Sequence, residues 1–429
     1  MTSAKQASAK QVSVGANASK PPSLDRAKQL ASALLSEGGE ASGALLSREL
    51  HEVLGKLDVD DRQGFERFLA TDFQPDATML RGAAERYLVD MTAEAAAHLA
   101  QAADPPRQEL LRRMNMAPGG TGALVAMRKG ILSRLRDEPT LELLDADLKH
   151  LFASWFNRGF LELRRIDWQS PAAVLEKLIA YEAVHEITGW DDLRRRLAPD
   201  RRCFAFFHPA LPGEPLIFVE VALVEGLAGA VPPLLLQDGD EEAARLRAAR
   251  ADTAIFYSIS NCQDGLRGVS FGNFLIKQVV EELQTELPRL QRFSTLSPIP
   301  GFRRWLMEQP RHGDAALLSK LETDRWWQDL ELSEQLRIGL MQRCAVYLTR
   351  RPSSGGRIDP VARFHLGNGA RLERINWLGN TAPRGIRESF GIMVNYLYDH
   401  DQIEANHEAF VHGTIVRSAE VEALLDAEF

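Results

Sequence analysis

The stretch that decides the fold of this chain runs from Ala254 to Gly272 and reads AIFYSISNCQDGLRGVSFG. Its apolar first part, Ile255 to Ile259, predicts a buried strand, and the polar residues that follow predict a loop. Beyond the glycines, apolar and polar residues recur at helical spacing, so we expect a helix that begins at Ser270 or Asn273. A strand, a glycine-rich turn and a helix in this order are typical of an α/β unit.

The turn between this strand and helix holds three glycines, Gly265, Gly268 and Gly272, together with Arg267. Glycines let the backbone approach a ligand closely, and the free amides of a helix N-terminus point toward an anion. The pattern therefore favours a pyrophosphate cradle to which Arg267 adds a positive charge. Glycines at such a turn are more often structural, and no Gly-Lys-Ser/Thr follows, so the turn alone does not establish a phosphate site.

The composition is that of a globular protein with a core of ordinary size, since 45% of the residues are hydrophobic and 26% are charged. The length of 429 residues predicts two or three domains. With 51 basic against 59 acidic residues the net charge is -8, which gives no electrostatic reason to bind nucleic acid. No apolar run is long enough to predict a membrane span.

The cysteines favour a reducing compartment. Cys203, Cys262 and Cys344 lie far apart without a C-x-x-C pair, so neither a zinc site nor a disulfide framework is expected. Cys262 follows the predicted strand but has no His or acid partner at motif spacing, which argues against a nucleophile. The C-terminal residues carry no peroxisomal address, and we expect a cytoplasmic protein.

Three regions follow one another along the chain. Residues 1–22 contain no acidic residue and are rich in Ala, Ser, Lys and Gln, and we expect a disordered tail. Residues 23–158 have helical patterns throughout and are expected to form an oligomerisation domain. Residues 159–429 mix strands with helices. The predicted fold class is therefore α+β, with an all-helical N-terminal domain followed by a mixed-sheet α/β domain.

Individual elements of the last region can be predicted from its patterns. The expected strands are Cys203–Phe207, Leu216–Val224, Thr253–Ile259 and Gln291–Leu296, and the expected helix after the glycine turn is Asn273–Leu287. A helix-rich insertion is expected over Arg311–Leu348. A hairpin is expected over Val361–Trp377, turning at Gly367-Asn368-Gly369.

Two side chains in this region are candidates for chemistry. Prolines on both sides of Ile299 restrict the backbone after Ser297, so its hydroxyl would be held at a rigid strand end, although a turn serine explains the pattern too. In the expected hairpin, alternation places Arg363 and His365 on one face of a strand. A histidine can give or take a proton near neutrality, but most of the ten histidines would be surface or core residues.

Several short sequence motifs, in the same order along the chain, resemble those of the malonyl-CoA decarboxylase family. They are Phe256–Ser260, Gly265–Val269, Phe274–Lys277, Leu296–Phe302, Val361–Leu366 and Arg374–Trp377. The resemblance spans most of Arg158 to Arg417. Its most specific motif is Leu296–Phe302, which reads LSPIPGF.

The resemblance implies a catalytic domain similar to the GNAT superfamily and a homotetramer built as a dimer of dimers. It also implies conversion of malonyl-CoA to acetyl-CoA and carbon dioxide without a metal or organic cofactor. The implied catalytic residues are Ser297, His365 and Tyr398, and the implied CoA-binding residues are Arg267, Gly268, Val269, Ser270, Phe271, Gly272, Asn273 and Ser297. Some family members carry a glutamate where this chain has Ser270, so a role for that carboxylate is not carried over.

Decarboxylation of a malonyl thioester leaves an enolate that must be stabilised and then protonated on carbon. We expect His365 to donate this proton and Ser297 to hydrogen-bond the departing carboxylate, with Ser297 as proton acceptor the alternative role. Two other functions stay open: an acyl-CoA N-acyltransferase on the same fold, and a CoA-sensing or scaffolding protein.

Overall fold

The computed structural model describes residues 23–236, 240–269, 275–308, 314–349 and 358–426. The chain divides into two compact units, Met1–Leu151 and Phe152–Phe429. The boundary predicted after residue 158 falls slightly beyond this division, and the predicted tail 1–22 lies outside the described residues.

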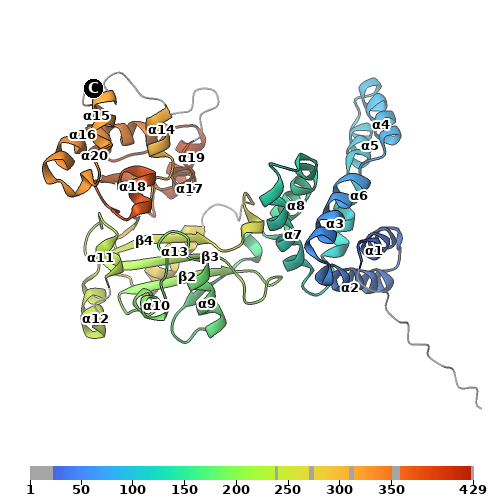
Figure 1. The fold of residues 1–429 in the computed structure, drawn as a ribbon, viewed down its shortest axis with the longest axis horizontal. Coiled ribbons are helices and arrows are strands. Elements are labelled where there is room, and N and C mark those ends of the chain that lie inside the picture. Colours follow the sequence, from blue (N-terminus) through green and yellow to red (C-terminus); the bar gives the residue numbers. More distant parts are fainter. Residues whose placement is uncertain (1–22, 237–239, 270–274, 309–313, 350–357, 427–429) are drawn as a thin grey trace, which may run out of the picture. The chain divides into compact units, whose positions relative to one another are not determined.

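The described part of the first unit is built from helices, as the sequence predicted (Figure 1). The helices are α1 (Leu24–Ser36), α2 (Glu40–Lys56), α3 (Val59–Asp72), α4 (Ala77–Val89), α5 (Ala93–Ala103), α6 (Pro106–Met114), α7 (Gly120–Arg134), the 3-10 turn η1 (Pro139–Leu141), and α8 (Glu142–Trp155), which continues into the second unit. Four of these helices, α1, α3, α4 and α5, begin after a residue whose side chain accepts from the first-turn amides. Asp76, for example, accepts hydrogen bonds from the backbone amides of Thr78 and Met79 at 2.9 and 2.8 Å.

The second unit is organised around a seven-stranded mixed sheet with the strand order β1-β2-β3-β4-β5-β7-β6. The strands are β1 (Glu162–Ile166), β2 (Arg201–Phe207), β3 (Pro215–Val224), β4 (Thr253–Asn261), β5 (Arg292–Thr295), β6 (Arg371–Asn376) and β7 (Met393–Tyr398). Only β4 and β5 are parallel, and all other neighbours are antiparallel. The mixed sheet after a helical region confirms the predicted fold class.

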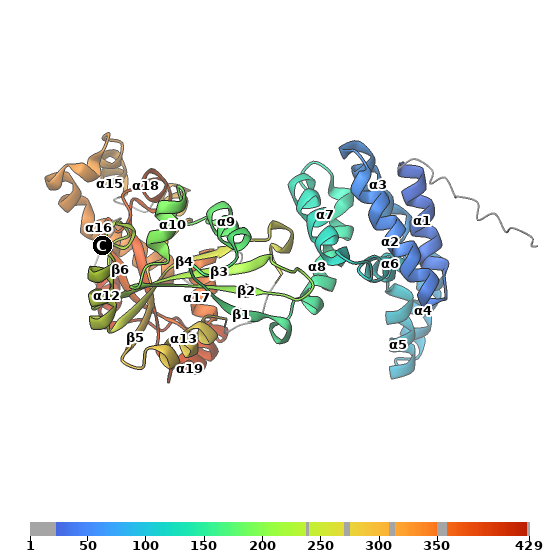
Figure 2. The ribbon, with the colours of Figure 1, turned by 90° about the horizontal axis from the view of Figure 1, so that it is seen from below.

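Helices cover both faces of this sheet. Figure 2 shows α9 (Ala172–Tyr181) and α10 (Trp190–Arg196) above it and α13 (Leu275–Glu286) and α19 (Ile403–Val411) below it. The remaining elements are the 3-10 turns η2 (Arg158–Phe160), η3 (Asp264–Leu266) and η4 (Trp326–Gln328), and the helices α11 (Pro232–Leu235), α12 (Glu241–Arg250), α14 (Phe302–Glu308), α15 (Asp314–Leu321), α16 (Leu330–Thr349), α17 (Pro360–Gly367), α18 (Pro383–Ser389) and α20 (Ala419–Asp426). None of the helices in the described ranges combines the length and the apolar character that a membrane crossing requires.

The β4 and β5 strands separate before β4 ends. Their parallel pairing covers only Thr253–Phe256 against Arg292–Thr295, whereas β4 continues to Asn261 along its other neighbour, β3. Beyond Thr295 the chain keeps only its pairing with β7, which begins within β5, and Ser297 and Val394 exchange backbone hydrogen bonds of 2.8 and 2.9 Å. The last part of β4 therefore has no strand partner on its β5 side among the described residues.

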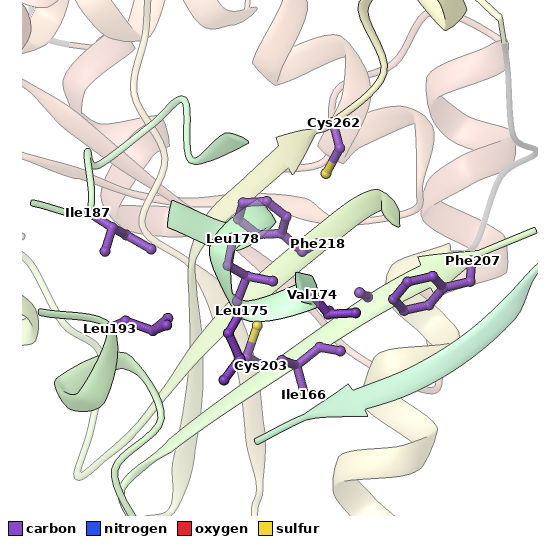
Figure 3. Close-up of a cluster of buried hydrophobic side chains, with 11 residues drawn as sticks. Ile166, Val174, Leu175, Leu178, Ile187, Leu193, Cys203, Phe207, Phe218 and Cys262 are labelled. Atoms are coloured by element: carbon purple, nitrogen blue, oxygen red, sulfur yellow. The ribbon is translucent and has the colours of Figure 1, made fainter. Parts of the chain in front are cut away.

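An apolar cluster fixes the sheet against α9. Val174, Leu175 and Leu178 of that helix pack on Cys203 and Phe207 of β2 and on Phe218 of β3 (Figure 3). All of these side chains are buried, and such packing is the main source of stability for a sheet covered by a helix.

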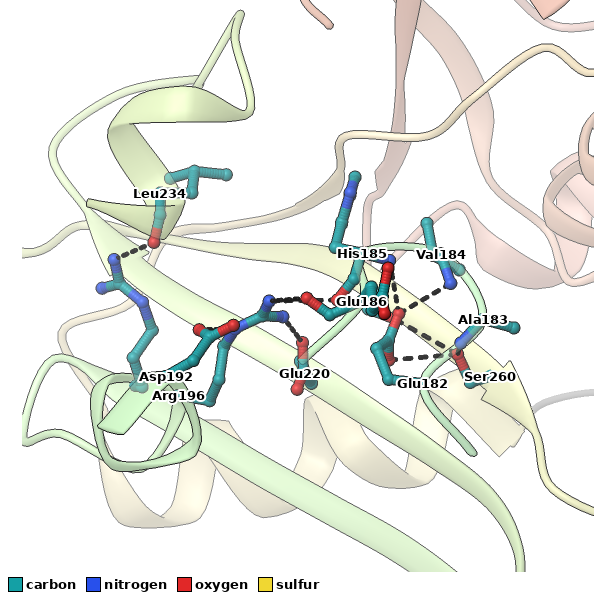
Figure 4. Close-up of polar contacts among 12 residues, drawn as sticks. Glu182, Ala183, Val184, His185, Glu186, Asp192, Arg196, Glu220, Leu234 and Ser260 are labelled. Atoms are coloured by element: carbon teal, nitrogen blue, oxygen red, sulfur yellow. Dashed lines mark hydrogen bonds and ion pairs between the residues drawn. The ribbon is translucent and has the colours of Figure 1, made fainter. Parts of the chain in front are cut away.

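A buried polar network lies over β3 and β4 (Figure 4). The carboxylate of Glu182 accepts hydrogen bonds from the Ser258 and Ser260 hydroxyls of β4, at 2.8 and 3.1 Å, and from the His185 amide at 2.6 Å. Nearby, Arg196 pairs with Glu220 of β3 at 2.7 Å. These contacts tie the unpartnered end of β4 to the loop that follows α9.

Four of the predicted strands and the helix after the glycine turn are confirmed within a few residues, as β2, β3, β4, β5 and α13. The hairpin predicted over Val361–Trp377 is wrong: its first part is helix α17, and only Arg371–Asn376 forms a strand, β6. The helix forms because the Asp359 side chain accepts from the amides of Val361 and Ala362 and Pro360 occupies the first helical position. His365 and Arg363 therefore do not lie on a strand face.

Candidate active site

The predicted residues Ser297, His365 and Tyr398 meet in one hydrogen-bonded chain. His365 lies in the last turn of α17, Ser297 follows the end of β5, and Tyr398 is the last residue of β7. Nε2 of His365 lies 3.1 Å from the Ser297 hydroxyl oxygen, and its Nδ1 lies 2.8 Å from the Tyr398 hydroxyl oxygen. The three residues are only 5%, 3% and 2% exposed, so the contacts are formed in the interior.

The hydrogen-bond partners of Ser297 fix the direction of this chain. The Ser297 hydroxyl donates to Oγ1 of Thr295 at 2.8 Å, and the amide of Tyr396 donates to the same oxygen at 3.1 Å. With its proton directed at Thr295, Ser297 is an acceptor toward His365, so Nε2 of the imidazole carries the hydrogen. Nδ1 then accepts from the Tyr398 hydroxyl. This order is opposite to that of a hydrolase triad, in which the histidine takes the proton of the serine.

Burial sets the charge of these groups. It lowers the pKa of His365 to about 3 and raises that of Tyr398, so both groups are neutral near pH 7. The ring of Tyr396 stacks on the imidazole with centroids 4.9 Å apart. Because His365 occupies the C-terminal turn of its helix, the helix dipole favours a positive charge there once a counter-ion is close. The site can therefore store a proton when it also holds an anion.

The turn that the sequence predicts to bind CoA is described only in part. After β4 and η3, Arg267 and Gly268 are exposed and Val269 is buried, and Gly268 has a φ of +75°, a conformation that glycine adopts without strain. Arg267 lies 3.6 Å from Asp264. The predicted residues Ser270, Phe271, Gly272 and Asn273 lie outside the described residues.

The turn and the hydrogen-bonded chain of Ser297, His365 and Tyr398 follow strands that end on the same side of the sheet. Since β4 and β5 are parallel neighbours, their carboxyl ends at Asn261 and Thr295 point the same way, one leading to the glycine turn and the other to Ser297. This edge is also where β4 has no neighbour on its β5 side. Ligands of open α/β sheets bind outside the carboxyl ends of strands, and the arrangement can hold an extended ligand there.

The other candidates from the sequence behave as follows. Cys262 is buried, and burial raises the pKa of its thiol, which argues against a nucleophilic role. In the ranges that the structure describes, no three His, Cys, Asp or Glu side chains are grouped closely enough to hold a metal ion.

Sequence reasoning missed two residues that contact the segments of Ser297 and His365, namely Thr295 and Asp359. Thr295 could have been found from its spacing, because residues two apart on a strand share one face and Thr295 precedes Ser297 by two positions. Asp359 could have been found as an Asp-Pro helix start. Its contact with the Ser297 loop is a long-range contact that no local pattern reveals.

Comparisons with known proteins agree on one family. The model of the malonyl-CoA decarboxylase C-terminal domain matches residues 159–429, and that of the N-terminal domain matches residues 73–156. The mitochondrial malonyl-CoA decarboxylase of Anser anser anser is 39% identical over 347 residues, covering 74% of this chain and 68% of that protein.

Solved structures lead to the same family. The malonyl-CoA decarboxylase of Rhodopseudomonas palustris is 50% identical to this chain with a TM-score of 0.87, and that of Agrobacterium vitis is 47% identical with a TM-score of 0.85. In both cases the match covers 94% of this chain and 100% of the other.

Proposed function

Because the chain belongs to the malonyl-CoA decarboxylase family and is a decarboxylase, as the sequence motifs predicted, we propose that it converts malonyl-CoA to acetyl-CoA and carbon dioxide at Ser297 and His365. The observation that carries the proposal is the buried contact of 3.1 Å between these two side chains at the sheet edge where β4 and β5 separate.

Substrate binding uses this edge and the glycine turn. The side of β4 that faces away from β3 has no strand partner after Phe256 among the described residues, and it offers hydrogen bonds to the amides of the pantetheine arm, much as a strand would. Arg267 to Asn273 bind the pyrophosphate, and the Arg267 side chain adds a positive charge for the anion. The thioester then lies near Ser297, and the bound malonyl-CoA extends from Ser297 to the glycine turn.

The malonyl carboxylate favours protonation of His365, which later donates this proton. When this anion enters the buried site, its charge favours the protonated imidazole, so a proton is taken up from solvent as substrate binds. The helix dipole at His365 acts in the same direction. A neutral His365 thus becomes an acid only when the substrate is present.

The reaction then balances in two steps. The carbon–carbon bond to the carboxylate breaks, carbon dioxide leaves, and the electron pair moves into the thioester as an enolate. The imidazolium of His365 gives its proton to the enolate carbon and returns to the neutral form. Tyr398 holds the ring in place through Nδ1. A positioned proton donor of this kind contributes about 10²–10⁴-fold to a rate.

Ser297 acts as the anchor for the carboxylate rather than as a base. Its proton is directed at Thr295, and rotation about the Cβ–Oγ bond redirects that proton to a carboxylate oxygen. Held in this way, the carboxylate lies out of the thioester plane, as the loss of carbon dioxide requires. The serine keeps its proton throughout.

The test is turnover of malonyl-CoA by the full chain without any amine. Equal amounts of carbon dioxide and acetyl-CoA support the decarboxylase, whereas transfer to an added amine with no carbon dioxide release would support an N-acyltransferase. Intact malonyl-CoA that is bound but not consumed would support a CoA-sensing protein. Ser297→Ala should lower kcat by about 10²-fold, since donors to developing charge have effects of this size.

Assembly and compartment belong to the same proposal. The chain forms a homotetramer, a dimer of dimers, through the helical region of residues 23–158, where Leu88, Val89 and Met91 are 68%, 89% and 73% exposed. It acts in the cytoplasm, which suits three buried free cysteines. Light scattering at assay concentration tests the first statement, because a monomer contradicts it. Cell fractionation tests the second.

A further inference from the structure

Asp359 joins the two segments that carry Ser297 and His365. Its carboxylate is 2% exposed. One oxygen accepts from the amides of Val361 and Ala362 at 2.9 and 3.2 Å, and so caps α17. The other accepts from the amide of Gly301 and from the hydroxyl of Tyr347, both at 3.2 Å.

Both segments are stiff between Asp359 and the reacting side chains. His365 lies on the single helix that Asp359 caps, so the imidazole moves with the cap. Gly301 is separated from Ser297 by Pro298 and Pro300, whose rings restrict the backbone. A change at the carboxylate is therefore passed to both ends of the contact between Ser297 and His365.

The surroundings show that this bridge is closely packed. A side chain on Gly301 would overlap the Tyr347 hydroxyl, so this position requires a glycine. The Tyr347 ring packs against Phe302 and Trp305, with centroid distances of 5.8 and 5.3 Å. Burial raises the pKa of Asp359, and the donors named above are its hydrogen-bond partners.

We propose that Asp359 is a positioning residue that sets the contact between Ser297 and His365 by tying the amide of Gly301 to the N-terminus of α17. The inference rests on the proposed function, because it concerns the same site. It adds a residue, Asp359, that contacts neither the substrate nor the imidazole and acts only by positioning Ser297 and His365.

The decisive variant is Asp359→Ser, which separates the two roles of the carboxylate, namely capping α17 and accepting from the Gly301 amide. A serine still caps a helix, but it is too short to reach Gly301. We expect kcat for malonyl-CoA to fall about 10–100-fold with KM within about twofold, since small misplacements of reacting groups have effects of this size. Tyr347→Phe removes one donor and keeps the bridge, so its kcat should fall less than about threefold.

The matched control is Asp76→Ser in α4, which replaces a cap with two amide bonds in the other unit. It should leave kcat and KM unchanged. If Asp359→Ser and Asp76→Ser both keep wild-type kcat, or if Asp359→Ser lowers only the amount of folded enzyme, Asp359 is a structural cap and the inference is wrong.

A second readout separates this inference from the proposed function. The ring ¹⁵N shifts of His365 report its hydrogen bonds without any turnover. They should change in Asp359→Ser and stay constant in Asp76→Ser. Unchanged shifts in Asp359→Ser overturn the inference even if the wild-type enzyme decarboxylates malonyl-CoA. A wild-type chain that leaves malonyl-CoA intact overturns the proposed function, while the shifts still decide the role of Asp359.

Discussion

Thr295→Val tests the direction of the hydrogen-bond chain, because valine has nearly the shape of threonine and no hydroxyl. In the wild-type protein Oγ1 of Thr295 accepts from the Ser297 hydroxyl at 2.8 Å and from the Tyr396 amide at 3.1 Å. Once this acceptor is removed, the nearest alternative for the Ser297 proton is Nε2 of His365, 3.1 Å away. The imidazole must then carry its hydrogen on Nδ1, and Nε2 is no longer a donor.

The size of the effect follows from the bonds that change. The Tyr396 amide stays buried without a partner, which should lower the free energy of unfolding by about 1–3 kcal/mol. The change of tautomer reverses the bond to Tyr398, a term of about 1 kcal/mol, so kcat should fall about 3–10-fold. KM should hardly change, because neither Thr295 nor His365 binds the nucleotide part of CoA.

The assays are steady-state release of carbon dioxide from malonyl-CoA and chemical unfolding of the same preparation. Thr295→Ser is the control, since it restores the hydroxyl and should keep kcat within about twofold of wild type. If Thr295→Val loses the expected stability and yet keeps wild-type kcat, Thr295 does not orient Ser297 and the reasoning about the proton fails.

Three further predictions concern the pH dependence, the cradle and the assembly. Burial lowers the pKa of His185 from 6.5 to about 4, so the unfolded chain takes up a proton between these values and the stability of the folded chain falls as pH drops through them. His185→Gln should flatten this dependence by about 3 kcal/mol in urea unfolding, and identical pH dependences of the two proteins would contradict the assignment. Arg267→Ala should raise KM for malonyl-CoA about fivefold with kcat unchanged and weaken the salt dependence of KM, whereas a fall in kcat alone would remove Arg267 from the cradle. Replacing both Leu88 and Val89 with serine should lower the molar mass measured by light scattering and leave the thermal midpoint nearly unchanged, because these side chains are exposed within the chain; an unaltered mass would place the interface elsewhere.

Much of the fold could be predicted because its strands are apolar runs bounded by turn residues. The β2, β3 and β4 strands are buried along most of their length and have continuous apolar patterns. β1 was missed because it is a polar edge strand with mainly exposed residues, for which the sequence has no buried pattern. β7 was missed because Asn395 interrupts its apolar residues; the Asn395 side chain is buried and donates to the backbone carbonyls of Thr295 and Ala228.

The error at His365 has a different cause. The residues from Val361 to Leu366 alternate in a way that suits a strand, but the Asp359 cap and Pro360 decide for a helix. His365 was chosen as the candidate catalytic histidine because of the family motif Val361–Leu366, and not because of the strand expected there. Its contact with Ser297 joins residues 68 positions apart in sequence, so only the folded chain could bring them together.

The central claim is that His365 protonates the enolate left by decarboxylation, and single-turnover reaction of malonyl-CoA with wild type and His365→Asn in deuterated water tests it most directly. Wild type should give acetyl-CoA with one deuterium in its methyl group, and His365→Asn should lose about 10²–10⁴-fold in rate while still binding malonyl-CoA. A His365→Asn enzyme that forms acetyl-CoA at the wild-type rate would contradict the account.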